Sequence, residues 1–116
     1  MINLTLLSKV SGFDTGFRRE IIDMIGKRYA RVKEQAYDLM AQHRFTACYL
    51  FLEQYLCDLQ PYSELTFVDG LKTELKALRS AQGDDEKQRI VTHFLNSVEL
   101  GLVEARIRME QEAAPM

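Results

Sequence analysis

The chain has 116 residues, of which 47% are hydrophobic and 28% charged, and its formal net charge is −2 at pH 7. This balance is typical of one folded domain over residues 1–116, and it argues against a disordered chain and against nucleic acid as a partner. No apolar run approaches the ~18 residues of a membrane span, and the first residues lack the basic segment of a secretion signal, so we expect no membrane partner and a cytoplasmic location.

The first part of the chain predicts a short helix followed by a long one. Apolar residues recur at helical spacing over residues 3–10, and two glycines then interrupt the pattern. Asp14 or Thr15 is expected to cap a second helix that runs to about residue 42. The apolar positions of this helix step by three and four, which predicts one buried stripe formed by Phe17, Ile21, Ile22, Ile25, Tyr29, Val32, Ala36, Leu39 and Met40.

The most apolar stretch of the chain begins at Arg44 and reads RFTACYLFLEQYLCDLQ. Apolar residues occur on nearly every face at helical spacing, which predicts a central helix with little access to water. Pro61 should end it, because proline has no backbone N–H and biases the preceding residue away from helical geometry. The break before this helix, at residues 42–46, contains neither Gly nor Pro, and we place it there because a helix of more than ~40 residues is unusual.

Two further helices are expected after Pro61. Ser63 or Asp69 should cap the fourth helix, with the adjacent glycine favouring the later start at Asp69, and Gly83 should close it in a left-handed conformation. Asp84 suits the positive end of the dipole of the last helix. Neither helix nor any other segment shows a period of two, so we predict an all-α fold: an antiparallel four-helix bundle with a short additional N-terminal helix.

Motifs for catalysis, nucleotides or metals are not found in the sequence. Neither His43 nor His93 follows a glutamate at the spacing that a di-metal bundle needs, and there is no P-loop or serine-nucleophile motif. We therefore expect no cofactor, no metal site and a binding module rather than an enzyme. His43 is interpreted as a histidine at a helix C-terminus and His93 as one at the boundary of the core.

Cys48 and Cys57 lie on one predicted helix, where a separation of nine residues puts them on roughly opposite faces, so they cannot bridge each other. Both are surrounded by apolar residues, which favours inert thiols over a catalytic cysteine. Lys72, Lys76 and Arg79 form a basic stripe, either a solvated helix face or a surface for an acidic protein partner.

The helix order and one N-terminal segment resemble the histidine-containing phosphotransfer (HPt) domain family. That family often opens with a Leu-x-x-x-Ser-Gly-Gly-Asp-x-x-Phe-like segment, and residues 7–17 read LSKVSGFDTGF, with Phe13 in place of one glycine. The resemblance covers almost the whole chain. It implies a helical bundle of a two-component phosphorelay whose partner is the receiver domain of a response regulator, or a hybrid kinase.

The family's phospho-accepting histidine stands in a His-x-Leu-Lys-Gly-Ser motif that this chain does not match. Aligned from the downstream side, Cys57 takes the place of the histidine and Gln60 that of the lysine. Counted from the upstream side, Glu53 takes the place of the histidine. A third register keeps a histidine, His43, but has Thr46 in place of the lysine. Because phosphotransfer needs an exposed neutral imidazole, the first two registers predict a module that carries no phosphate.

Three hypotheses about function follow from the family resemblance, the basic stripe and the apolar stripes of the long helices. The first is an HPt-like signalling module that binds a receiver domain without carrying phosphate, through Lys72, Lys76, Arg79 and Gln60. The second is an active phosphotransfer protein that uses His43. The third is a structural or oligomerising bundle, such as a homodimer, that is unrelated to phosphorelays.

Overall fold

The computed structural model describes residues 15–60, 63 and 65–113, and every regular element among them is a helix. The four helices are α2 (Thr15–Ala41), α3 (Phe45–Leu59), α4 (Leu65–Ser80) and α5 (Asp84–Ala113). The all-α prediction is therefore confirmed, whereas the short helix expected at residues 3–10 lies outside the described part of the chain. None of these helices is both long and apolar enough to cross a membrane, within the residues that the structure describes.

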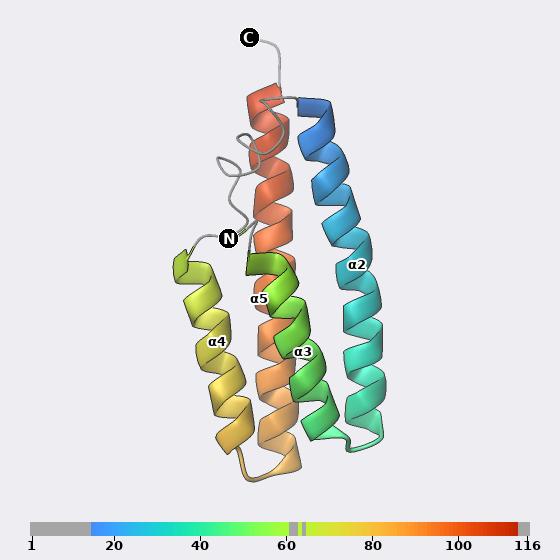
Figure 1. Ribbon diagram of the computed structural model, residues 1–116, viewed down its shortest axis with the longest axis vertical. Coiled ribbons are helices and arrows are strands. Elements are labelled where there is room, and N and C mark those ends of the chain that lie inside the picture. The colour runs from blue at the N-terminus through green and yellow to red at the C-terminus, as the bar shows by residue number, and fades with distance from the viewer. Residues whose placement is uncertain (1–14, 61–62, 64, 114–116) are drawn as a thin grey trace.

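The helices pack side by side so that each of them contacts two others, in the closed order α2, α3, α4, α5 and back to α2 (Figure 1). This arrangement is compatible with a helical bundle. The longest axis measures 52 Å and the other two 24 and 21 Å. The long helices α2 and α5 extend beyond α3 and α4 at one end, while the α2–α3 and α4–α5 connections lie together at the other end (Figure 1).

The core is built from the apolar stripes that the spacing predicts. The fully buried large side chains are Tyr55, Phe94, Ile22, Leu52, Leu59, Leu71, Leu95, Val68, Val91 and Val98. Tyr29 makes a polar contact across this core: its hydroxyl, in α2, donates a hydrogen bond to the carbonyl of Leu95 in α5, at 2.9 Å. Burial of apolar surface from all four helices is what holds them together, and the Tyr29 hydroxyl is satisfied inside it.

Helix α3 is less enclosed than its composition predicts. Its buried residues are Phe45, Cys48, Leu52, Tyr55, Leu56 and Leu59. Leu50 is 59% exposed and Cys57 is also exposed, so the prediction of a helix with little access to water was wrong for one face. The physical reason is that α3 packs between α2 and α4, which leaves its remaining side open to solvent.

The predicted break at residues 42–46 is confirmed, and it is made without glycine. The N–H of Arg44 donates to the carbonyl of Leu39 at 2.9 Å, and the N–H of His43 donates to that of Met40 at 3.0 Å. This pair of bonds is the Schellman motif, which needs a left-handed residue directly after the helix. His43 adopts that conformation, with φ 58°.

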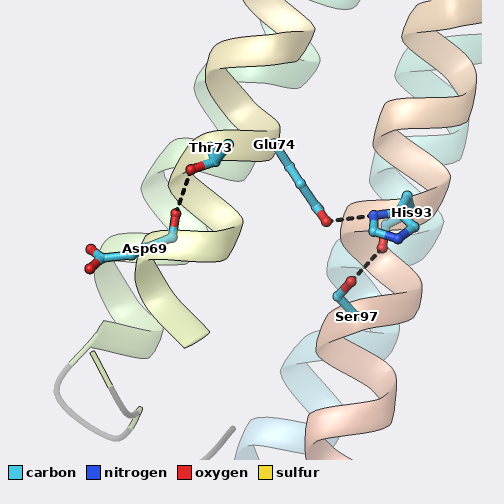
Figure 2. Close-up of polar contacts among 5 residues, drawn as sticks. All are labelled: Asp69, Thr73, Glu74, His93 and Ser97. Carbon is cyan, nitrogen blue, oxygen red and sulfur yellow. Dashed lines mark hydrogen bonds and ion pairs between the residues drawn. The ribbon is translucent and has the colours of Figure 1, made fainter. Parts of the chain in front are cut away.

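Of the two starts expected for the fourth helix, the favoured one at Asp69 was wrong, and the helix begins two residues after the other candidate, Ser63. Helix α4 begins at Leu65, and Asp69 lies inside it, where its carbonyl accepts a hydrogen bond from the Thr73 hydroxyl at 3.0 Å (Figure 2). The Ser63 hydroxyl donates a hydrogen bond to the carbonyl of Leu59 at 2.8 Å. Ser63 thus satisfies the end of α3, and a glycine next to Asp69 is tolerated within α4.

The turn before α5 also differs from its prediction in one respect. Gly83 does not adopt the left-handed conformation expected of it. Its carbonyl instead accepts the N–H of Lys87 at 3.0 Å, which is the first hydrogen bond of the following helix. Helix α5 begins at Asp84, as predicted.

Candidate functional site: the groove between α3 and α4

A groove between α3 and α4 brings together most of the residues that the sequence singles out. Its first section, of about 300 Å³, is lined by Tyr49, Glu53, Leu56, Cys57, Gln60, Lys72, Leu75 and Lys76. The adjoining section, of about 500 Å³, is lined by Phe45, Thr46, Tyr49, Leu50, Glu53, Leu78, Arg79 and Lys87. Because Tyr49 and Glu53 line both sections, we treat the two as one feature, the α3–α4 groove.

Helical spacing explains why these side chains share one groove. On α3, Tyr49, Glu53 and Cys57 follow one another in steps of four residues, so they lie on one face of the helix. On α4, Lys76 is four residues from Lys72 and three from Arg79, which gives a second stripe along the facing helix. Since α3 and α4 pack against each other, the two stripes form the walls of the groove.

Positive charge dominates the α3–α4 groove. Its lining includes the cations Lys72, Lys76, Arg79 and Lys87, against one carboxylate, Glu53. Such a surplus of one sign on an exposed surface attracts and orients partners of the opposite sign.

Tyr49 lines both sections of the groove. Glu53, four residues further along the same helix, is the main reason that the pKa of Tyr49 is raised. Arg79 of α4, which lines the groove with Tyr49, acts on that pKa in the opposite direction. Sequence reasoning missed Tyr49 because its role depends on the pairing of α3 with α4, which its own spacing does not reveal.

The two cysteines differ sharply in their surroundings. Cys48 is buried, burial raises the pKa of its thiol to about 11, and its Sγ lies 4.0 Å from the carbonyl oxygen of Ala36. Cys57 is exposed and lines the α3–α4 groove beside Lys72 and Lys76. Both thiols are free, as predicted, but the expectation of an apolar environment holds for Cys48 and is wrong for Cys57.

The structure separates the predicted site residues into two places. Cys57, Glu53 and Gln60, which occupy the histidine and lysine places in the two better registers, all line the α3–α4 groove. His43 does not line it and lies in the turn between α2 and α3. Its side chain is 68% exposed, and its Nδ1 lies 3.1 Å from the Asp84 carboxylate at the start of α5.

His93 also has a carboxylate partner, which sequence reasoning did not find. Figure 2 shows Glu74 of α4 reaching toward His93 of α5, whose Nδ1 lies 2.5 Å from the carboxylate oxygen Oε1. Burial raises the pKa of Glu74, while His93 and Ser97 act in the opposite direction. Among the described residues the other carboxylate oxygen, Oε2, is buried without a hydrogen-bond partner.

The interpretation of His93 as a histidine at the boundary of the core predicts neither its exposure nor this pairing. Its side chain is 72% exposed. No signal in the sequence points to Glu74, because the contact depends on how α4 and α5 align when they pack. Within the described part of the chain, no group of three or more His, Cys, Asp or Glu side chains is arranged to hold a metal ion.

Comparison of the chain with protein-family models, with curated proteins and with solved structures gives no match. The likeness to the HPt family therefore rests on the sequence segment and the helix order alone. What the molecule itself offers as a site is the α3–α4 groove, with its cationic walls and its exposed thiol.

Proposed function

We propose that this chain is an HPt-like signalling module, an antiparallel four-helix bundle that binds the receiver domain of a response regulator or hybrid kinase without carrying phosphate itself. The observation that supports this function is the meeting of Cys57 and Gln60 with Lys72 and Lys76 in one groove. The resemblance assigns the first two positions to the phospho-accepting histidine and its lysine. A thiol and an amide therefore stand where the phosphotransfer groups would be.

The chemistry of the groove suits binding better than phosphotransfer. Attack on an aspartyl phosphate needs a neutral imidazole nitrogen at the surface of the groove, and neither Cys57 nor Glu53 supplies one. The lysines and Arg79 remain, and a surface with this charge complements the acidic pocket of a receiver domain. Binding without transfer would let the chain sequester or scaffold such a regulator.

The test is a binding measurement with receiver domains from the same organism. Calorimetry should show a complex, and Lys76→Glu should weaken it at least about tenfold because a repulsive charge replaces an attractive one. Lys27→Glu is the matched control, since Lys27 lies on α2 and does not line the α3–α4 groove. Equal affinities for the Lys76→Glu and unmodified proteins would remove the groove from the proposal.

A second candidate function, active phosphotransfer through His43, has one observation in its favour. A carboxylate at Nδ1, here Asp84, holds the proton on that nitrogen in the neutral ring and leaves the Nε2 lone pair for nucleophilic attack. Phosphate transfer from a phosphorylated receiver that disappears in His43→Gln and survives in Cys57→Ser would establish this function. Complex formation without transfer would establish the first one.

A further inference from the structure

A second groove lies between α2 and α3, on the flank of α3 that is turned away from α4. Its volume is about 670 Å³, which falls within the range of about 300–1,000 Å³ that is usual for small-molecule sites. Phe51 and Tyr55 of α3 line it, and neither lines the α3–α4 groove. We name this feature the α2–α3 groove. Nothing in the function proposed above uses it.

One part of the α2–α3 groove is apolar. Val32 and Tyr55 in its lining are buried, and Phe51 is half-buried and packs against the core. Met24, also in the lining, is 56% exposed. This surface suits the apolar body of a ligand, because covering it removes further hydrocarbon from water.

The cations of the groove come from successive turns of α2. Lys27, Arg28 and Arg31 line it, whereas the carboxylates Glu20 and Asp23 line the part nearer the start of that helix. Positive charge is therefore concentrated at one end of the groove. An anionic group belongs at that end, and a guanidinium can bind a carboxylate through two parallel hydrogen bonds.

Arg28 already shows which kind of group the cationic end accepts. Its guanidinium forms an ion pair with the carboxylate of Asp58 on α3. Lys27 and Arg31 make no ion pair with any residue that the structure describes. The groove thus contains one guanidinium that is engaged by a carboxylate of the chain and two cations that are available to a ligand.

Tyr55 provides an independent indication of a missing acceptor. Its side chain is 2% exposed, and its hydroxyl has no hydrogen-bond partner among the described residues. Burial raises the pKa of Tyr55, so the hydroxyl keeps its proton and remains a donor at neutral pH. Arg28 lines the groove together with Tyr55, and its partner Asp58 lies three residues after Tyr55 on α3, so this ion pair is on the same side of α3 as the Tyr55 side chain. A buried donor without an acceptor is costly and calls for an explanation.

We propose that the α2–α3 groove binds a small amphipathic carboxylate, whose apolar body lies against Val32 and Phe51 and whose carboxylate is bound by Arg28 and Arg31. The carboxylate competes with Asp58 for the guanidinium of Arg28. A carboxylate at that position is also brought to the Tyr55 hydroxyl, and it supplies the acceptor that this donor lacks. One ligand of this chemistry therefore accounts for the apolar lining, the cationic end and the unpaired hydroxyl.

The experiment uses octanoate as the probe and follows the amide NMR signals of the full chain. Octanoate should shift the signals of Val32, Phe51 and Tyr55. Octylammonium, which has the same body and the opposite charge, should leave them in place, and so should acetate, which lacks the body. Similar shifts with octanoate and octylammonium would overturn the proposal, as would octanoate shifts confined to other residues.

Variants then separate this site from a general affinity for anions. Asp58→Asn should bind octanoate several-fold more tightly, because it frees Arg28, and Arg31→Glu should bind it several-fold more weakly. Tyr55→Phe should also weaken binding while leaving the melting temperature equal or higher, since the unpaired hydroxyl is gone. Lys76→Glu, in the α3–α4 groove, is the control and should not change octanoate affinity. Weaker binding in Asp58→Asn would contradict the proposed competition for Arg28.

Discussion

The Nδ1 nitrogen of His43 lies 3.1 Å from a carboxylate oxygen of Asp84, and this contact joins the turn after α2 to the first residue of α5. The His43 ring also meets Phe45 edge-on, with 6.4 Å between the ring centroids, and the ammonium of Lys87 lies 5.5 Å from the centre of the same Phe45 ring. Side-chain contacts therefore hold together the end of the molecule where both connections lie, and the α2–α3 turn at this end has no glycine.

The left-handed backbone of His43 leads to a first prediction. His43→Val should lower the free energy of unfolding by about 1–2 kcal/mol, because a β-branched residue is strained at positive φ and the Asp84 contact is lost. His43→Gly should stay within about 0.5 kcal/mol of the unmodified protein, since it relieves strain but adds freedom to the unfolded chain. Urea unfolding followed by circular dichroism measures both. Equal losses in the two variants would show that the imidazole matters and the backbone conformation does not.

The half-buried carboxyl of Glu74 predicts a pH-dependent stability difference. Because burial raises its pKa in the folded state, the folded protein favours the protonated carboxyl, and the stability that this gives is lost as pH rises through the raised pKa. Glu74→Gln should therefore melt at a higher temperature than the unmodified protein near neutral pH. The difference in melting temperature between the two proteins should shrink below about pH 4, the range of an unperturbed glutamate. A difference that grows in acid would contradict a raised pKa of Glu74 in the folded state.

The two thiols should react at very different rates. At about pH 8 a disulfide reagent should modify one cysteine per folded chain quickly, and Cys57→Ser should abolish that reaction. Cys48 should react only when the chain unfolds or at a pH close to the value of about 11 to which burial raises its pKa. Mass spectrometry of the modified protein identifies the site. Rapid reaction of Cys48 in the folded protein would contradict its burial.

The open face of α3 predicts opposite outcomes for two neighbouring leucines. Leu52→Ala should cost about 2–5 kcal/mol of stability, because Leu52 is fully buried and its loss leaves a cavity. Leu50→Ala should change stability by no more than about 0.5 kcal/mol, because Leu50 is mostly exposed. The same unfolding titration measures both variants. A large loss for Leu50→Ala would mean that its side chain is covered in solution.

The sequence predicted the long helices well, and it was less reliable for α3 and the start of α4. In α2 and α5 the apolar stripe is narrow, so its period directly indicates the buried face. In α3 apolar residues surround the helix, and composition alone does not show that Leu50 and Cys57 face solvent. The start of α4 was misplaced because the helix tolerates Gly70, which the sequence suggested as a boundary.

The sequence predicted several residues of the candidate site but not the contacts that they make across helices. Helical spacing and the family resemblance indicated Cys57, Gln60 and the basic stripe, and the structure brings them into one groove. The place of Tyr49 beside Arg79 in the groove, and the pairing of Glu74 with His93, depend on how two helices align when they pack. No local pattern encodes that alignment, so contacts between helices are what sequence reasoning missed.

The unequal lengths of the helices make protection from hydrogen exchange uneven along the molecule. Where all four helices overlap, an amide can exchange only when much of the core opens. Beyond the ends of α3 and α4, α5 continues beside α2 (Figure 1). In the second half of α5, Leu100, Val103 and Ile107 are exposed. Amides at this end should exchange through small local openings. The molecule then loosens from one end while the α3–α4 groove keeps its shape.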